Sequence, residues 1–165
     1  MRYIVALISL LILISGCSNE NSEINAAEWR ASPTFHIPVT FGDGTKGEYI
    51  LVGEEGRIGF LTGGLPMVTG KPNKYMWHLW GDTLDDTQQL FGKNIEIRGL
   101  SKETGEEILV FTGSTGIPNP NIPDNNHVAR MPSSMSLPYA GLWRLDAYLE
   151  DELFGSIVVQ VQKEV

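Results

Sequence analysis

The sequence contains a single cysteine, Cys17, among 165 residues, so no internal disulfide can form and the fold must be held by apolar packing. Positive charge is also scarce: 12 Lys and Arg oppose 20 Asp and Glu, giving a net charge of −8. No run of basic residues occurs. Because nucleic acids bind clustered positive charge, we expect no nucleic-acid partner, and the acidity argues against flat adhesion to anionic lipid.

Motifs for catalysis are missing as well. The three histidines, His36, His78 and His127, lie in separate segments without the close spacing of zinc ligands. No serine stands in a Gly-x-Ser-x-Gly motif, and the glycine pairs lack a phosphate-binding context. We therefore predict no catalytic residues, no cofactor and no enzymatic activity.

Two groups of acidic and amide residues could in principle bind a metal ion. The cluster Asp82, Asp85 and Asp86 lacks the ligand alternation of an EF-hand loop and instead predicts a capped helix start. The run Asp124-Asn125-Asn126 offers oxygen ligands for a weak calcium site, but a solvated turn is the interpretation that we favour. The prediction is that the chain has no metal site.

The one long apolar run follows Arg2 and spans residues 4–14. It has the order of a secretory signal peptide and is short of the roughly 20 residues that a membrane-spanning helix needs. Its end, Ile14-Ser15-Gly16-Cys17, resembles a lipobox, the site of bacterial lipoprotein signal peptidases. The resemblance implies cleavage before Cys17 and a diacylglycerol thioether there, whose two chains suffice for anchoring. An ordinary signal with an accidental cysteine is the alternative.

We predict three regions: a lipoprotein signal peptide at 1–16, a flexible acidic tether at 17–32, and a β-sandwich domain at 33–165. Polar and acidic residues dominate the tether, and such composition does not support a core. Trp29, near its end, is expected to dock on the domain, with a membrane-proximal role as the alternative. The domain has about the usual size of a single core.

Alternation of apolar and polar residues predicts about nine strands in the domain, as expected for a half-buried antiparallel sheet. In the segment 74–80, Tyr75 and Trp77 share one face while His78 and Trp80 share the other. Only Asp82 to Gln89 favours a helix, with Asp82 or Thr83 as the N-cap. The predicted strands are 35–39, 48–52, 57–61, 74–80, 94–100, 107–112, 134–137, 141–150 and 153–162.

The closing segment 141–159, with Gly141-Leu142-Trp143 opening a strand and an apolar last strand, resembles the final hairpin of bacterial immunoglobulin-like domains. With the segment 63–81 and the lipobox, the chain resembles a family of small Ig-like lipoproteins of unknown function from Gram-positive spore-forming bacteria. The resemblance implies an all-β, immunoglobulin-like antiparallel β-sandwich of about 7–9 strands, with no disulfide and at most one short helix. It carries no reaction.

These observations favour a lipid-anchored, non-enzymatic module on the extracytoplasmic face of the cell membrane, held there through the Cys17 lipid. We expect it to bind an envelope component or an extracellular protein. Candidate binding residues are Trp77, Trp80 and His127, with one of the two tryptophans expected in the core. Candidate binding loops are 63–73 and 113–131. One alternative is an Ig-like protease inhibitor, although Asn119-Pro120-Asn121 is at most weakly similar to the inhibitory loop of such proteins. Another is a metal-binding or hydrolytic surface protein.

Overall fold

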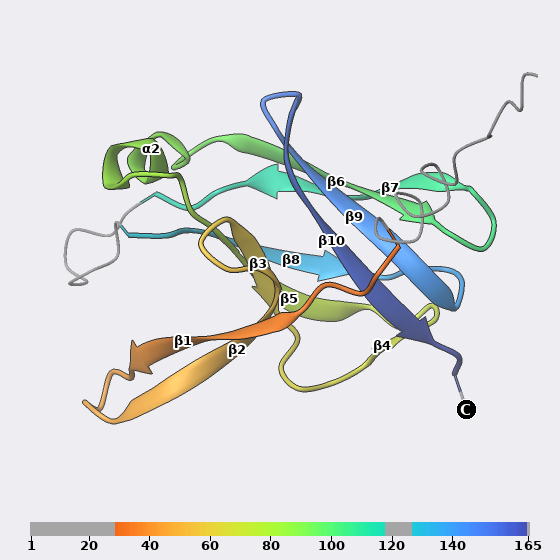
Figure 1. Ribbon diagram of the computed structural model, residues 1–165, viewed down its shortest axis with the longest axis horizontal. Coiled ribbons are helices and arrows are strands. Elements are labelled where there is room, and N and C mark those ends of the chain that lie inside the picture. The colour runs from red at the N-terminus through yellow and green to blue at the C-terminus, as the bar shows by residue number, and fades with distance from the viewer. Residues whose placement is uncertain (1–28, 118–126, 165) are drawn as a thin grey trace, which may run out of the picture.

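A computed structural model describes residues 29–117 and 127–164 of the chain. Ten strands form two five-stranded sheets that pack face to face (Figure 1). Sheet A has the order β1-β2-β3-β5-β8, and sheet B has the order β4-β10-β9-β6-β7. All pairings are antiparallel except that of β4 with β10.

The strands of sheet A are β1 (Thr34–Thr40), β2 (Lys46–Glu54), β3 (Ile58–Leu61), β5 (Asn73–Leu79) and β8 (Ala129–Met135). The strands of sheet B are β4 (Met67–Val68), β6 (Asn94–Ser101), β7 (Glu107–Ser114), β9 (Gly141–Leu149) and β10 (Glu152–Gln162). The β1–β2 hairpin extends away from the rest of the sandwich at the lower left of Figure 1.

The core lies between the sheets and is centred on two tryptophans, Trp77 from β5 and Trp143 from β9, both fully buried. Phe60 packs against the Trp77 ring at a centroid distance of 4.9 Å. The Trp77 indole N–H donates to Ser133 Oγ at 3.1 Å, and the Trp143 indole N–H donates to the Tyr139 carbonyl at 2.9 Å. Each ring is therefore buried without leaving its polar atom unpaired, which is what burial of tryptophan requires.

The predicted helix is confirmed as α2 (Leu84–Gln89), with Thr83 as its N-cap. Thr83 Oγ1 accepts from the Asp86 backbone N–H at 3.1 Å, and the Thr83 backbone N–H donates to Asp86 Oδ2 at 3.1 Å. This reciprocal capping box explains the acidic cluster without a metal. Within the described part of the chain, no helix is long and apolar enough to span a bilayer.

The predicted fold class is confirmed: the domain is an immunoglobulin-like β-sandwich with one short helix. The run β10-β9-β6 corresponds to strands G-F-C of that fold, and β3-β5-β8 in the other sheet corresponds to A-B-E. The ten strands exceed the expected range of 7–9 because β4 was not predicted. This strand has only two residues, too few to show an alternation of apolar and polar side chains. The expected strand 134–137 lies earlier, at β8, and the segment joining β7 to β8 crosses from one sheet to the other.

Candidate binding face

An apolar row crosses the outer face of sheet A, the face turned away from the core. Register places Phe35 opposite Leu51, Leu51 opposite Leu61, Leu61 opposite Met76, and Met76 opposite Pro132. Each strand of the sheet therefore contributes one apolar side chain to the same line. The solvent face of an antiparallel sheet usually carries polar residues, so this row is the unusual feature of the molecule.

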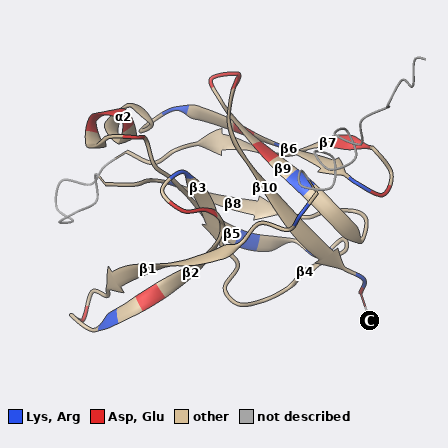
Figure 2. Ribbon diagram, viewed as in Figure 1, with Lys and Arg blue, Asp and Glu red and all other residues tan. Residues whose placement is uncertain are grey.

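No strand position on this outer face carries a carboxylate, although the chain is acidic overall. Glu48 and Glu54 of β2 pair with Pro38 and Ile58, which puts them on the opposite face of the sheet. Many of the acidic residues lie at turns and on α2, while others, such as Glu48, Glu96 and Asp146, lie within strands but not on this face (Figure 2). The outer face of sheet A consists of Phe35, Ile37, Val39, Gly47, Tyr49, Leu51, Gly53, Gly59, Leu61, Lys74, Met76, His78, Arg130, Pro132 and Ser134. Its charged groups are thus basic.

At the β1 end of the row, the Phe35 ring packs over Gly59 and contacts further aromatic side chains. A Cβ at Gly59 would lie 2.8 Å from Phe35 Cζ, so the Phe35 ring occupies the space that any side chain there would need. Phe35 meets the Trp80 ring edge-on at 6.1 Å, and Trp80 stacks on His78 at 5.8 Å. Leu51 beneath them is fully buried, so this end of the face forms a small apolar layer of its own.

His78 is the polar member of that layer and is only 1% exposed. Its Nδ1 bonds the Met76 carbonyl at 3.2 Å, while its Nε2 is buried and has no hydrogen-bond partner. Burial lowers the pKa of His78 from 6.5 to about 4; the bond to Met76 opposes this change and the charge of Arg130 adds to it. His78 is therefore neutral at pH 7, and protonation works against the packing around it.

At the β8 end the row opens into a shallow groove of about 470 Å³. Leu61, Met76 and Pro132 form its apolar floor, and Lys74 lies at its rim. A second depression of about 320 Å³ shares Tyr75 with it and includes the loop residues Leu65 and Pro66. Leu65 is 62% exposed, so the predicted binding loop 63–73 adjoins the groove with a free apolar side chain. The groove residues are Leu61, Gly63, Lys74, Tyr75, Met76, Pro132, Ser133 and Ser134.

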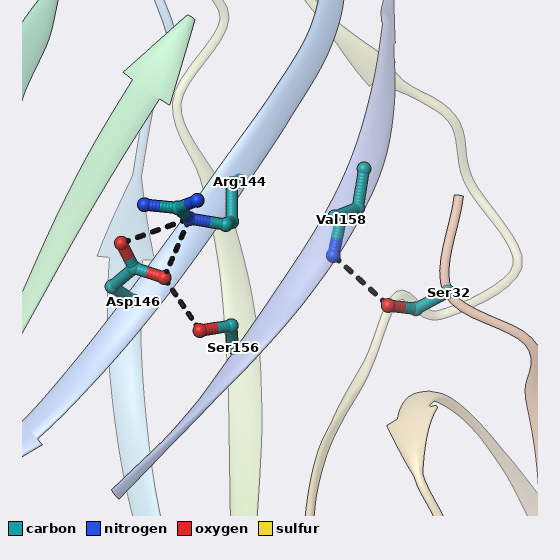
Figure 3. Close-up of polar contacts among 5 residues, drawn as sticks. All are labelled: Ser32, Arg144, Asp146, Ser156 and Val158. Carbon is teal, nitrogen blue, oxygen red and sulfur yellow. Dashed lines mark hydrogen bonds and ion pairs between the residues drawn. The ribbon is translucent and has the colours of Figure 1, made fainter. Parts of the chain in front are cut away.

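A polar cluster lies on the opposite side of the molecule, on the outer face of sheet B (Figure 3). The Arg144 Nε–H group donates to both oxygens of Asp146, at 3.0 and 3.1 Å, and Ser156 Oγ donates to Asp146 at 2.6 Å. Asp146 is buried although it points away from the core. Alternation with the apolar residues Trp143, Leu145 and Ala147 predicts solvent exposure at positions 144 and 146, so the sequence does not indicate the cluster. It contains no imidazole and is an ion pair with a bound hydroxyl rather than a catalytic triad.

The structure separates the predicted site residues. Trp77 lies in the core, so its predicted binding role is wrong: a fully buried side chain cannot touch a ligand. Trp80 lies on the outer face of sheet A, partly buried, and packs on Phe35 and His78. His127 is exposed at the start of the segment leading into β8. Cys17, the run Asp124-Asn125-Asn126 and the Asn119-Pro120-Asn121 echo lie outside the described residues.

Metal ligation finds no support in the described residues, where no three His, Cys, Asp or Glu side chains lie close enough together to hold an ion. His36 bonds Glu48 at 3.0 Å on an exposed surface, far along the chain from His78. Both histidines are accounted for by local contacts. What distinguishes the surface is thus the apolar row and its groove, not a cluster of ligands.

The sequence matches the family described as a domain of unknown function (DUF4871) over residues 19–159. The chain belongs to this family. A solved structure, a "Putative Lipoprotein from Bacillus anthracis", is 21% identical and covers 96% of this chain and 98% of that chain, with a TM-score of 0.55. At this identity the likeness to that lipoprotein shows a shared fold.

An immunoglobulin-like protein from Pseudomonas aeruginosa is 14% identical and covers 79% of this chain and 92% of that chain, with a TM-score of 0.32. No curated protein matches the chain. The predicted resemblance to a family of small Ig-like lipoproteins of unknown function is confirmed by the DUF4871 match and by the Bacillus structure.

Proposed function

We propose that the chain is a lipid-anchored, extracytoplasmic, non-enzymatic module that binds a partner on the outer face of sheet A. The anchor rests on the lipobox ending at Cys17, and the name of the similar Bacillus protein supports it. The observation that carries the binding role is the accessible end of the apolar row, where Leu61, Met76 and Pro132 line the groove. Exposed apolar surface of this kind marks binding sites in soluble proteins.

The chemistry of the face selects the partner. Leu61, Met76 and Pro132 offer an apolar groove, and the charged groups of the face are Lys74 and Arg130. Carboxylates are absent from its strand positions, whereas the rest of the molecule is acidic. The complementary partner is a protein segment that buries apolar side chains in the groove and faces Lys74 with a carboxylate. An envelope polymer is the other outcome that the test distinguishes.

The test is photo-crosslinking in the native membrane. A photoreactive residue replaces Ser134, beside the groove, and in a control strain it replaces Thr112, exposed on sheet B. We expect a discrete protein adduct from the Ser134 position and none from Thr112. Met76→Glu, which puts a carboxylate into the groove, should abolish the adduct. Leu109→Glu, at a leucine 60% exposed on β7, should leave it intact.

Three results would count against this proposal. Equal adducts from both positions would show that the face is not selective. An adduct insensitive to Met76→Glu would place the partner elsewhere. A polydisperse, protease-resistant adduct would identify an envelope polymer instead of a protein. The urea midpoint of each variant shows whether it is folded.

A further inference from the structure

Residues 29–32, shortly before β1, are attached to sheet B, and Ser32 hydrogen-bonds to the part of the β10 edge that β4 leaves unpaired. The Ser32 backbone N–H donates to the Val158 carbonyl at 2.9 Å, and Ser32 Oγ accepts from the Val158 N–H at 2.9 Å (Figure 3). Further along this edge, Arg57 donates twice to the Phe154 carbonyl, at 3.0 and 3.2 Å, and β4 pairs with Val161. Ser32 thus occupies the middle of an edge that other groups cover at both ends.

The polar cluster of sheet B extends this attachment. The Trp29 ring lies 6.0 Å from Arg144 Cζ, within the range of a cation–π contact, so Trp29 takes the docked position that its sequence suggested. Arg144 is in turn oriented by the buried carboxylate of Asp146, which Ser156 also holds. Trp29 and Ser32 therefore contact the outer face of sheet B and its edge. The expected tether is thus attached to the domain from residue 29 onward.

We infer that residues 29–32 form a fixed strap that directs the lipid-anchored protein with the outer face of sheet B toward the bilayer and the binding face of sheet A away from it. This inference rests on the lipid anchoring in the proposed function. Asp146 is a positioning residue here, since it acts on the strap through Arg144.

The length of the chain before the strap supports this orientation. Eleven residues lie between Cys17 and Trp29, so the twelve Cα–Cα steps span only about 40 Å even when fully extended. With sheet B toward the bilayer, the strap itself lies on the membrane side of the domain, so little of this length is needed. With sheet A toward the bilayer, the chain between Cys17 and Trp29 must extend past the thickness of the sandwich. This thickness comprises two sheets about 10 Å apart and the side-chain layer outside each sheet. The second orientation therefore requires more of the available chain length than the first.

The test uses the full lipidated protein, purified from membranes and reconstituted in vesicles of phosphatidylcholine and phosphatidylglycerol with a quencher on the lipid headgroup. Because Cys17 carries the lipid, an introduced cysteine is the single free thiol for a fluorophore. Thr112→Cys reports the outer face of sheet B, and Ser134→Cys reports the outer face of sheet A. Both replace exposed hydroxyl residues on strands, so they are matched.

We expect at least about threefold stronger quenching at Thr112→Cys than at Ser134→Cys, because the short tether holds sheet B nearer the bilayer. Ser32→Pro removes the Ser32 N–H donor and hydroxyl acceptor together and should bring the two values closer. Amide exchange at Val158 should then accelerate, because the Val158 N–H loses Ser32 Oγ as its acceptor. If Ser32 did not contact β10, the substitution would leave this exchange rate unchanged.

Equal quenching at both positions, or stronger quenching at Ser134→Cys, in vesicle-bound protein would overturn the inferred orientation while leaving the anchor intact. An unchanged ratio in Ser32→Pro with faster Val158 exchange would show that the strap does not set orientation. Mass spectrometry that finds no lipid on Cys17 would instead overturn the proposed anchoring, and the orientation with it. The two failures are therefore distinguishable.

Discussion

His78 should make the stability of the domain fall as the pH drops from 6.5 toward 4. Its pKa is 6.5 in the unfolded chain and about 4 in the folded protein, chiefly because the ring is buried. As the pH falls, the unfolded state therefore binds a proton first, and this proton stabilises the unfolded state. Above pH 6.5 the ring is neutral in both states and has no effect; below pH 4 it is charged in both and the loss is complete.

The size of the effect follows from the same two values. A difference of about 2.5 units corresponds to about 3 kcal/mol when the transition is complete, and to about 2 kcal/mol by pH 5. The cause is visible in the packing: Trp80 stacks on the ring, Tyr49 meets it edge-on at 6.5 Å, and Nε2 has no acceptor for a new proton. A charged ring would be buried without a partner.

Urea unfolding measures this loss directly, with the fluorescence of the buried Trp77 and Trp143 as the signal. The soluble chain lacking residues 1–16 and carrying Cys17→Ser is compared at about pH 7, 6 and 5. His78→Phe keeps a ring in the layer but cannot titrate, so its unfolding free energy should fall by about 2 kcal/mol less across this range. His36→Gln, at an exposed histidine, should behave as wild type. Equal pH dependence in wild type and His78→Phe would show that titration of His78 does not lower the stability.

Three further substitutions test the packing, each by its urea midpoint. Gly59→Ala should destabilise by about 1–3 kcal/mol, because the new Cβ lies 2.8 Å from Phe35 Cζ, whereas Gly42→Ala, with no atom within 4 Å, should change little. Asp151→Gly should stabilise by about 0.5–1 kcal/mol, because the residue has φ +73° in a two-residue hairpin turn that favours glycine. Asp146→Asn should cost about 1–3 kcal/mol, since its charge receives bonds from Arg144 and Ser156 while buried.

The sequence predicted the strands whose alternation is strong, and it did so for a physical reason. Trp143, Leu145 and Ala147 on β9 and Ile157 and Val159 on β10 recur at every second residue, and all are buried. The capping of α2 by Thr83 was also readable, because the cap chemistry is local. The position of β8 was predicted wrongly because it contains Pro132, and a proline in a sequence argues against a strand. The strand tolerates this proline because it lies at the edge of its sheet.

The candidate binding face could not be predicted because alternation shows which residues share a face but not which face is inside. Phe35, Ile37 and Val39 alternate with His36 and Pro38 and so share one face, yet only the pairing of β1 with β2 shows that this face is turned away from the core. The row from Phe35 to Pro132 joins five strands that are distant in sequence. Its existence depends on register, which a single sequence does not reveal.

Oxidation of Met76 tests the claim that a partner covers the outer face of sheet A. Among the methionines of the described residues, Met67, Met131 and Met135 are buried and Met76 alone is partly exposed, in the groove. Peroxide converts an accessible methionine to its sulfoxide, so mass spectrometry reads the accessibility of this one side chain. Leu109→Met, on sheet B, provides an exposed control in the same molecule.

We expect Met76 to oxidise at least about threefold more slowly in native membranes than in the purified chain, while a methionine at position 109 oxidises equally in both. Equal rates at Met76 in membranes and in the purified chain would contradict the claim that a partner binds there.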